Sequence, residues 1–271
     1  MRSSRTPASL KPLSQKVSSY ILYVFCGFVF LLLVAPTFVV VPISFSSSRF
    51  LQFPPPGFST QWYENYFTSR DWMEATWTSL QIASAVCILA TVLGTILAVA
   101  LVKGRFPGKN MIYALAVSPM IIPLIISAVA IYFFYSRLHM VGTKAGVVIA
   151  HTILAIPFVL VIVSSALKGF DETLERASLS LGANPLKTFL LVTLPVIRPA
   201  VISGALFAFI TSFDEVVIVI FIAGTHAVTL PKRMWDGIRL EIDPTIAAVA
   251  SLLIGLSVLL MIAISLHRKR R

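Results

Sequence analysis

The chain has 271 residues, of which 57% are hydrophobic and only 12% are charged. Soluble domains contain about 45–50% apolar and about 25% charged residues, so this composition excludes an ordinary soluble fold and indicates an integral membrane protein. A net charge of +11 would suggest nucleic acid in a soluble chain. Here the basic residues flank apolar runs, which indicates membrane topology, and we expect no nucleic-acid partner.

Six apolar runs are each long enough to cross about 30 Å of hydrocarbon. In chain order they cover residues 20–43, 77–102, 111–135, 147–166, 199–223 and 245–266. They predict an all-α polytopic membrane domain over residues 20–266, between an N-terminal tail (1–19) and a basic tail (267–271). The first run exceeds the roughly 7–15 apolar residues of a signal peptide, so we expect it to remain as a transmembrane helix.

Lysine and arginine are unevenly distributed between the segments that join these runs. Fifteen lie in alternate segments, and the other segments hold seven. The richer set comprises the two tails, residues 103–110 and residues 167–198. Cytoplasmic segments carry such an excess, so both termini and the 167–198 loop are predicted to be cytoplasmic.

Several features inside and between the runs leave two interpretations open. Pro119 and Pro123 should kink the third run and Pro157 the fourth, either to line a pathway or as ordinary bundle packing. The aromatic-rich segment 49–74 forms an interfacial belt or contacts an external binding protein.

Cys26 and Cys87 lie in apolar runs, where we expect buried free thiols.

The polar interruption from Leu174 to Pro195 predicts two short helices, neither long enough to cross a bilayer. Asp171 can cap the first helix, and Gly182 can take the left-handed conformation that ends it. Asn184 followed by Pro185 predicts the start of a second helix, which should stop near Pro195.

This segment resembles the signature cytoplasmic loop of permease subunits in binding-protein-dependent ABC importers. The resemblance rests on Gly182, nine further residues, then Val192 and Leu194-Pro195. The Glu-Ala-Ala triplet of the family aligns with Arg176-Ala177-Ser178, and the nearest acid, Glu175, lies one position too early.

The resemblance implies a type I importer permease fold in a bacterial cytoplasmic membrane. A coupling helix from about Asp171 to Leu181 would dock on a separate ATPase dimer, which binds ATP and magnesium, while this chain binds no cofactor and is not an enzyme. A second permease and an extracytoplasmic substrate-binding protein are the other implied partners. The expected coupling residues are Glu175, Arg176, Ala177, Gly182, Ala183, Leu194 and Pro195.

Two adjacent acids, Asp214 and Glu215, lie inside the fifth run. A charge at a helix centre costs about 2.5–3.5 kcal/mol in lipid, so the pair should face protein or water. Helical spacing aligns Glu215 with a stripe of small residues, Gly204, Ala208 and Thr211. We expect Asp214, Glu215 and Thr211 to line the substrate pathway and bind a cation; alternatively, the acids pair with a partner subunit or gate the pathway.

Further sequence resembles the polyamine branch, and within it the C-type spermidine/putrescine permease. The matching stretches are Ser212–Val216, Pro54–Ser59 with Trp62-Tyr63, and Thr229–Pro231 with Asp243–Thr245. The resemblance implies a polyamine substrate. Related branches import other amines, amino-acid derivatives such as 4-aminobutyrate, or ferric iron, and these remain alternatives.

Two other classes compete with a permease subunit, namely an autonomous secondary transporter with an acid relay and a membrane-embedded enzyme. The first would usually have internal repeats, and the second would need a constellation of catalytic groups; the sequence has neither. The four histidines form no metal or catalytic pattern, and we expect His151 to be packed or hydrogen-bonded rather than a ligand. We therefore expect no metal site.

Overall fold

The computed structural model describes residues 13–240 and 244–269, and its helices confirm the all-α prediction. The described residues contain no regular strand; one isolated bridge joins Ser46 and Phe58. The chain forms two compact units, Met1–Tyr66 with Ile242–Arg271, and Phe67–Glu241. Most of the N-terminal tail, Asp243 and the last two residues of the basic tail lie outside the described residues.

The unit built from the two ends of the chain contains α1 (Leu13–Ser44), most of α2 (Gln61–Thr68) and α12 (Thr245–Lys269). The connection before α2 folds back on the end of α1. Trp62 Nε1 donates to the Ser46 carbonyl at 2.8 Å, and the Tyr63 hydroxyl lies 2.7 Å from Ser44 Oγ. These aromatic side chains therefore hold the loop that was predicted to lie at the membrane surface.

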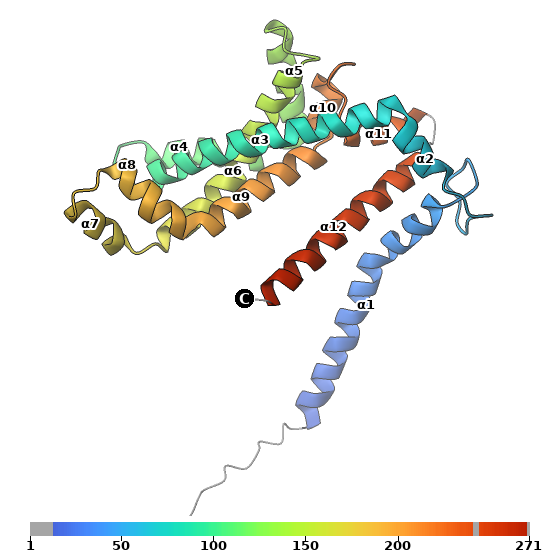
Figure 1. Ribbon diagram of the computed structural model, residues 1–271, viewed down its shortest axis with the longest axis horizontal. Coiled ribbons are helices and arrows are strands. Elements are labelled where there is room, and N and C mark those ends of the chain that lie inside the picture. Colours follow the sequence, from blue (N-terminus) through green and yellow to red (C-terminus); the bar gives the residue numbers. More distant parts are fainter. Residues whose placement is uncertain (1–12, 241–243, 270–271) are drawn as a thin grey trace, which may run out of the picture. The chain divides into compact units, whose positions relative to one another are not determined.

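The second unit is organised around three helices that run along one another (Figure 1): α3 (Arg70–Lys103), α6 (Lys144–Lys168) and α9 (Leu194–Asp214). Small residues let these helices approach closely. A Cβ placed on Gly94 of α3 would lie 2.7 Å from Val159 Cβ, and one on Gly204 of α9 would lie 3.3 Å from Val159 Cα. Shape-matched contact of this kind drives helix association where lipid removes the hydrophobic effect.

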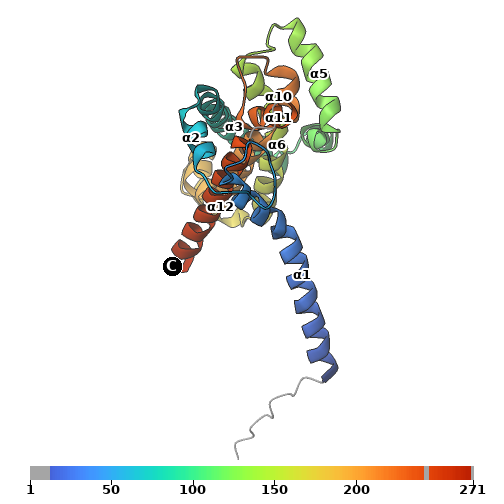
Figure 2. The same cartoon turned by 90° about the vertical axis from the view of Figure 1, so that its right-hand side faces the viewer.

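The third apolar run is broken rather than kinked. It forms α4 (Lys109–Val117), a 3₁₀ turn (Ser118–Met120) and α5 (Leu124–Arg137), with a bend of 101° that carries α5 away from α3 (Figures 1 and 2). Pro119 and Pro123 remove two donors within one turn, and Pro123 adopts an extended ψ of 129°. Pro157, by contrast, does not break α6, which is continuous.

The fifth run also differs from its predicted limits. The helix ends at Asp214, and α10 (Val217–Ile222) follows after a two-residue break, before α11 (Leu230–Leu240). Within residues 13–240 and 244–269, four helices are long and apolar enough to cross a membrane, and the bent pair counts as a fifth if it is one span. The four are Tyr20–Ser44, Arg70–Lys103, Lys144–Lys168 and Pro185–Asp214. Thr245–Leu259 is a shorter apolar helix within the described residues.

Candidate coupling loop and substrate cleft

The first short helix of the polar loop, α7 (Glu172–Ser180), has the capping residues that its sequence predicts. Asp171 Oδ1 accepts a hydrogen bond from the Thr173 amide at 2.9 Å, which lowers the pKa of the Asp171 carboxyl. At the other end Gly182 has φ +88°, and its amide donates to the Leu179 carbonyl at 3.0 Å. With the 3.2 Å bond from the Ala183 amide to the Ser178 carbonyl, this is a Schellman cap.

The second helix begins as predicted but does not stop near Pro195. Asn184 Oδ1 accepts from the Lys187 amide at 2.8 Å and caps α8 (Pro185–Thr188). A π-helical turn (Phe189–Thr193) then leads directly into α9. The wider π turn relieves the clash between the Pro195 ring and the preceding turn, so the proline does not end the helix.

Replacing Gly182 with valine should uncouple uptake from ATP hydrolysis. Nothing lies within 4 Å of a Cβ at this position, so the cost is backbone strain at positive φ, about 1–2 kcal/mol. Gly182→Asn is the matched control because asparagine tolerates the left-handed conformation. Uptake and ATPase rate should be measured together in the assembled transporter. Normal coupled uptake by the valine variant would contradict a role for this turn.

Glu175 faces back into its own chain. Lys103 Nζ and Thr193 Oγ1 both donate to Glu175 Oε1, and Lys103 also lies 5.4 Å from the centre of the Phe170 ring. Burial alone would raise the pKa of Glu175, but the bonds from Lys103 and Thr193 together with the Lys103 charge hold it below its ordinary value. We call this group, Glu175 with Lys103 and Thr193, the brace; it ties α7 to the end of α3 and to the π turn.

The other expected coupling residues lie on the surface of the loop. Arg176 pairs with Glu172 of the same helix at 3.2 Å, and both side chains are exposed. Ala177, Gly182 and Pro195 are exposed, and Ala183 and Leu194 are half-buried. Around them lies a group of exposed leucines, Leu174, Leu179, Leu181 and Leu186, with Leu181 89% exposed. The helices α7 and α8 lie at one end of the bundle (Figure 1), and an exposed apolar surface of this kind is typical of a docking site.

Glu215 lies beyond the end of α9, so its predicted place on the helical stripe is wrong. Gly204 and Ala208 of that stripe are buried, but Glu215 is extended, with φ −72° and ψ 122°. Its Oε1 accepts from the Ile218 amide at 2.8 Å and its Oε2 from the Val219 amide at 3.3 Å. The side chain thus caps α10, and this local bonding competes with continuation of α9.

The Glu215 carboxylate is also held by α6. It is buried, with 7% of the residue exposed, and Oε2 lies 3.2 Å from His151 Nε2 in a contact that is not aligned as a hydrogen bond. His151 Nδ1 lies 2.9 Å from Ser212 Oγ of α9. His151 is therefore a buried, hydrogen-bonded residue, as expected, and Glu215 joins α6, α9 and α10.

Asp214 is in a different situation from its neighbour. It is exposed and makes no hydrogen bond or ion pair within the part of the chain that the structure describes. With Thr211 and one edge of Glu215 it lines a cleft of about 680 Å³. The other lining residues are apolar: Pro119, Met120, Ile122, Leu124, Leu154, Phe158, Phe207, Ile210, Val216 and Val217. Asp214 thus places a free carboxylate in an apolar cleft.

Two aromatic rings form part of the cleft wall, and the broken third run forms another part. The rings of Phe158 (α6) and Phe207 (α9) are nearly parallel, with centroids 6.4 Å apart. Sequence reasoning missed both phenylalanines as cleft residues because apolar residues carry no distinguishing signal in an apolar run. Pro119 was identified, since a pathway role was one of the two interpretations of the prolines.

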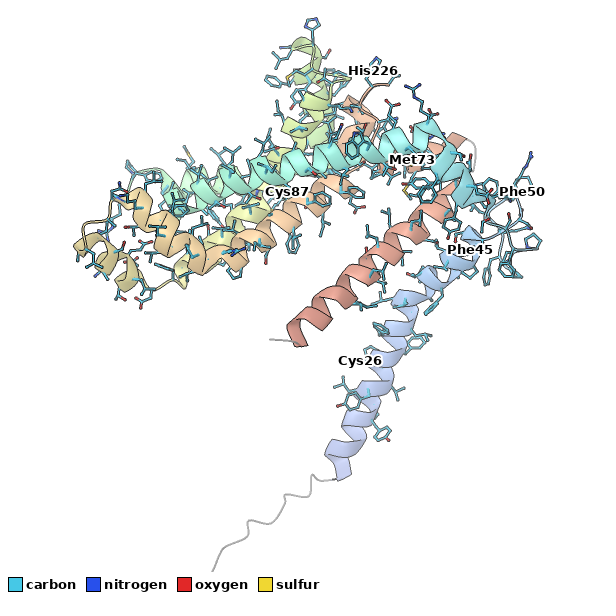
Figure 3. The ribbon with its side chains drawn as sticks, viewed as in Figure 1. Cys26, Phe45, Phe50, Met73, Cys87 and His226 are labelled. Atoms are coloured by element: carbon cyan, nitrogen blue, oxygen red, sulfur yellow. The ribbon has the colours of Figure 1, made fainter. Side chains whose placement is uncertain are left out.

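The two cysteines belong neither to the described lining of the cleft nor to the coupling loop. Cys87, midway along α3 (Figure 3), donates to the Ala205 carbonyl at 3.3 Å and is half-buried. Cys26 is also free but exposed, so the prediction that this chain buries it is wrong. The apolar helix that carries it is not buried by any other part of the described chain over its most apolar stretch. Within the described residues, no group of three or more His, Cys, Asp or Glu could hold a metal ion.

Comparison with known proteins gives consistent matches. The family described as "Binding-protein-dependent transport system inner membrane component" matches residues 90–271. The putrescine transport system permease protein PotI of Escherichia coli K12 is 38% identical, covering 84% of this chain and 83% of that protein. The spermidine/putrescine transport system permease protein PotC of Haemophilus influenzae is 32% identical, covering 86% and 91%.

The fold also matches a solved structure. A chain of a bacterial ABC transporter involved in the import of the acidic polysaccharide alginate superimposes with a TM-score of 0.78, covering 95% of this chain and 99% of that one. Its sequence identity is 12%, so this match concerns the fold alone.

Proposed function

The chain belongs to the family of inner membrane components of binding-protein-dependent transport systems, and we propose that it carries aliphatic polyamines such as putrescine through the cytoplasmic membrane. It would do so as a permease subunit of an ATP-driven importer, forming half of the translocation pathway.

The free carboxylate of Asp214 is the observation that carries this proposal. A diamine has an ammonium group at each end of a methylene chain. The carboxylate can replace lost water around one ammonium with charge-assisted hydrogen bonds, and the apolar wall can contact the methylenes. The rings of Phe158 and Phe207 add a surface that attracts cations.

The lining of the cleft also favours a diamine over the alternatives. Among the described residues, no Lys, Arg or His lines it, so the carboxylate of 4-aminobutyrate would have no cationic partner there. Ferric iron would need several oxygen ligands, and Glu215 already binds two backbone amides. 4-Aminobutyrate and ferric iron are therefore the alternative substrates against which a polyamine is tested.

The coupling loop would transmit the work of the ATPase. In this proposal, α7 and the exposed leucines dock on one subunit of an ATPase dimer, which binds ATP and magnesium. Closure of that dimer draws the two coupling helices of the paired permeases together and switches the pathway from inward-facing to outward-facing. A soluble binding protein delivers the substrate from outside.

We further propose six spans, with α4 and α5 together as the third and α12 as the sixth. Both termini and the coupling loop then lie in the cytoplasm. The uneven distribution of Lys and Arg supports this orientation.

Uptake of labelled putrescine and spermidine, with and without this gene, tests the substrate. The strain must lack other polyamine importers, and excess unlabelled 4-aminobutyrate serves as competitor. Loss of polyamine uptake on deletion, with no competition in the parent strain, is the expected result. Unchanged polyamine uptake would leave a family permease with a different substrate.

A further inference from the structure

A second cavity lies where the C-terminal ends of α3 and α6 meet the start of α4. It measures about 250 Å³, and its polar lining consists of Lys109, Asn110, Tyr113, Ser164 and Lys168. None of these residues lines the substrate cleft or belongs to the brace. The transport function therefore leaves this polar cavity unexplained.

The positive charge of the cavity lining favours an anionic ligand. Lys109 Nζ donates to the carbonyls of Val102 and Gly104, at 3.3 and 3.2 Å, which holds its ammonium group beside the end of α3. Lys168 is exposed and has no hydrogen bond or ion pair within the described residues. Among the residues that the structure describes, no carboxylate lines the cavity.

The acids of the adjacent loop cannot easily supply the missing counter-ion, because each already has a partner. Asp171 caps α7, Glu172 pairs with Arg176, and Glu175 binds Lys103. Two lysines therefore share one cavity, and the described part of the chain places no negative charge there to balance them.

The buried hydroxyl group of Ser164 is a second indication of a ligand, and it does not depend on charge. It is only 5% exposed, and its Oγ has no hydrogen-bond partner in the described structure. Buried hydroxyl groups are normally satisfied, so a solitary one at a cavity wall requires an explanation. An acceptor oxygen in the cavity would provide it. Two ammonium groups, a hydroxyl and an amide together match the oxygens of a phosphate group.

The surroundings indicate that this phosphate belongs to a lipid. The helix α4, which starts at the cavity, exposes Met111, Ile112 and Leu115, by 67%, 40% and 64%. We propose that the cavity binds the headgroup phosphate of an anionic phospholipid, whose acyl chains lie along this face of α4. Basic pockets at the cytoplasmic ends of spans are suited to such headgroups.

The test uses the complete purified transporter after delipidation in detergent. Binding of phosphatidylglycerol and of phosphatidylcholine is measured by native mass spectrometry and by the shift in melting temperature. We expect phosphatidylglycerol to bind at least tenfold more tightly, and the variant Lys109→Ala with Lys168→Ala to lose this preference. Ser164→Ala should weaken binding to a smaller extent.

Arg105→Ala is the matched control, because Arg105 is exposed in the loop between α3 and α4 but does not line the cavity. An equal loss in this variant would overturn the proposal in favour of diffuse charge attraction. If the alanine pair fails to assemble, the pair Lys109→Arg and Lys168→Arg keeps both charges and should retain the preference. Displacement of the lipid by millimolar inorganic phosphate would identify a free-phosphate site and refute the lipid assignment.

Discussion

Replacing Asp214 with asparagine should lower putrescine uptake by about ten- to a hundred-fold while the subunit remains inserted and assembled. Asparagine has the same size but cannot form charge-assisted bonds to an ammonium group, which contribute about 1.5–3 kcal/mol. Each 1.4 kcal/mol corresponds to roughly a tenfold change in affinity. Because Asp214 is exposed and makes no bond within the described chain, its loss should cost little stability. Initial uptake rates at several putrescine concentrations measure the effect.

Two further carboxyl-to-amide changes make this experiment selective. Glu74→Gln alters an exposed acid of α3 outside the cleft and should leave uptake unchanged. Glu215→Gln weakens the cap of α10 and the contact with His151, so it should lower the melting temperature instead. Loss of assembly in the Asp214 variant, or its normal uptake, would show that this carboxylate does not bind substrate.

Replacing Glu175 with alanine should reduce uptake at least tenfold while ATP hydrolysis continues without stimulation by loaded binding protein. The change leaves Lys103 and Thr193 without their shared acceptor, and both are mostly buried. Leaving such groups unsatisfied costs about 1–3 kcal/mol. The coupling helix α7 then loses its tie to α3, so motion of the ATPase no longer reaches the bundle. ATPase and uptake rates in proteoliposomes measure this loss of coupling.

Glu172→Ala provides the comparison, because Glu172 is an exposed acid on the same helix whose pair with Arg176 contributes little. Coupling that fails equally in both variants would assign the effect to the helix surface rather than to the brace. The pH dependence gives a separate check. The folded-state pKa of Glu175 lies below its ordinary value of 4.5, so the stabilisation is complete above that value and is lost as the pH falls through the lowered pKa. Uptake at pH 6 should therefore keep its coupling.

The coupling loop could be predicted in detail because its structure depends on neighbouring residues. Asp171 and Asn184 accept bonds from amides two and three residues away, and Gly182 supplies the left-handed turn between them. Capping of this kind is encoded within a few residues of sequence. The end of the second helix was not predictable in the same way, since a π turn just before Pro195 lets the helix continue into α9.

The adjacent acids show where sequence reasoning stopped. Helical spacing assigned Asp214 and Glu215 to one continuous helix, and both were expected in the pathway. Both line the cleft, but the structure gives them different surroundings: Glu215 is buried and bonded to α10 beside His151 of α6, whereas Asp214 is exposed and has no partner among the described residues. This division depends on His151 and Ser212, which lie 61 residues apart in the chain.

By itself the sequence determined the membrane class, the apolar runs and the caps of the coupling loop. Hydrophobic length and capping residues act locally, so they can be recognised without knowledge of the fold. The tertiary structure alone decided that Glu175 braces α3, that the third run breaks beside the cleft, and that Asp214 keeps a free carboxylate. Each of these outcomes depends on which distant residues packing brings together. Glu175 finds partners on α3 and the π turn, whereas Asp214 finds none among the described residues. A polar group in an apolar bundle is costly unless it is hydrogen-bonded or reaches water.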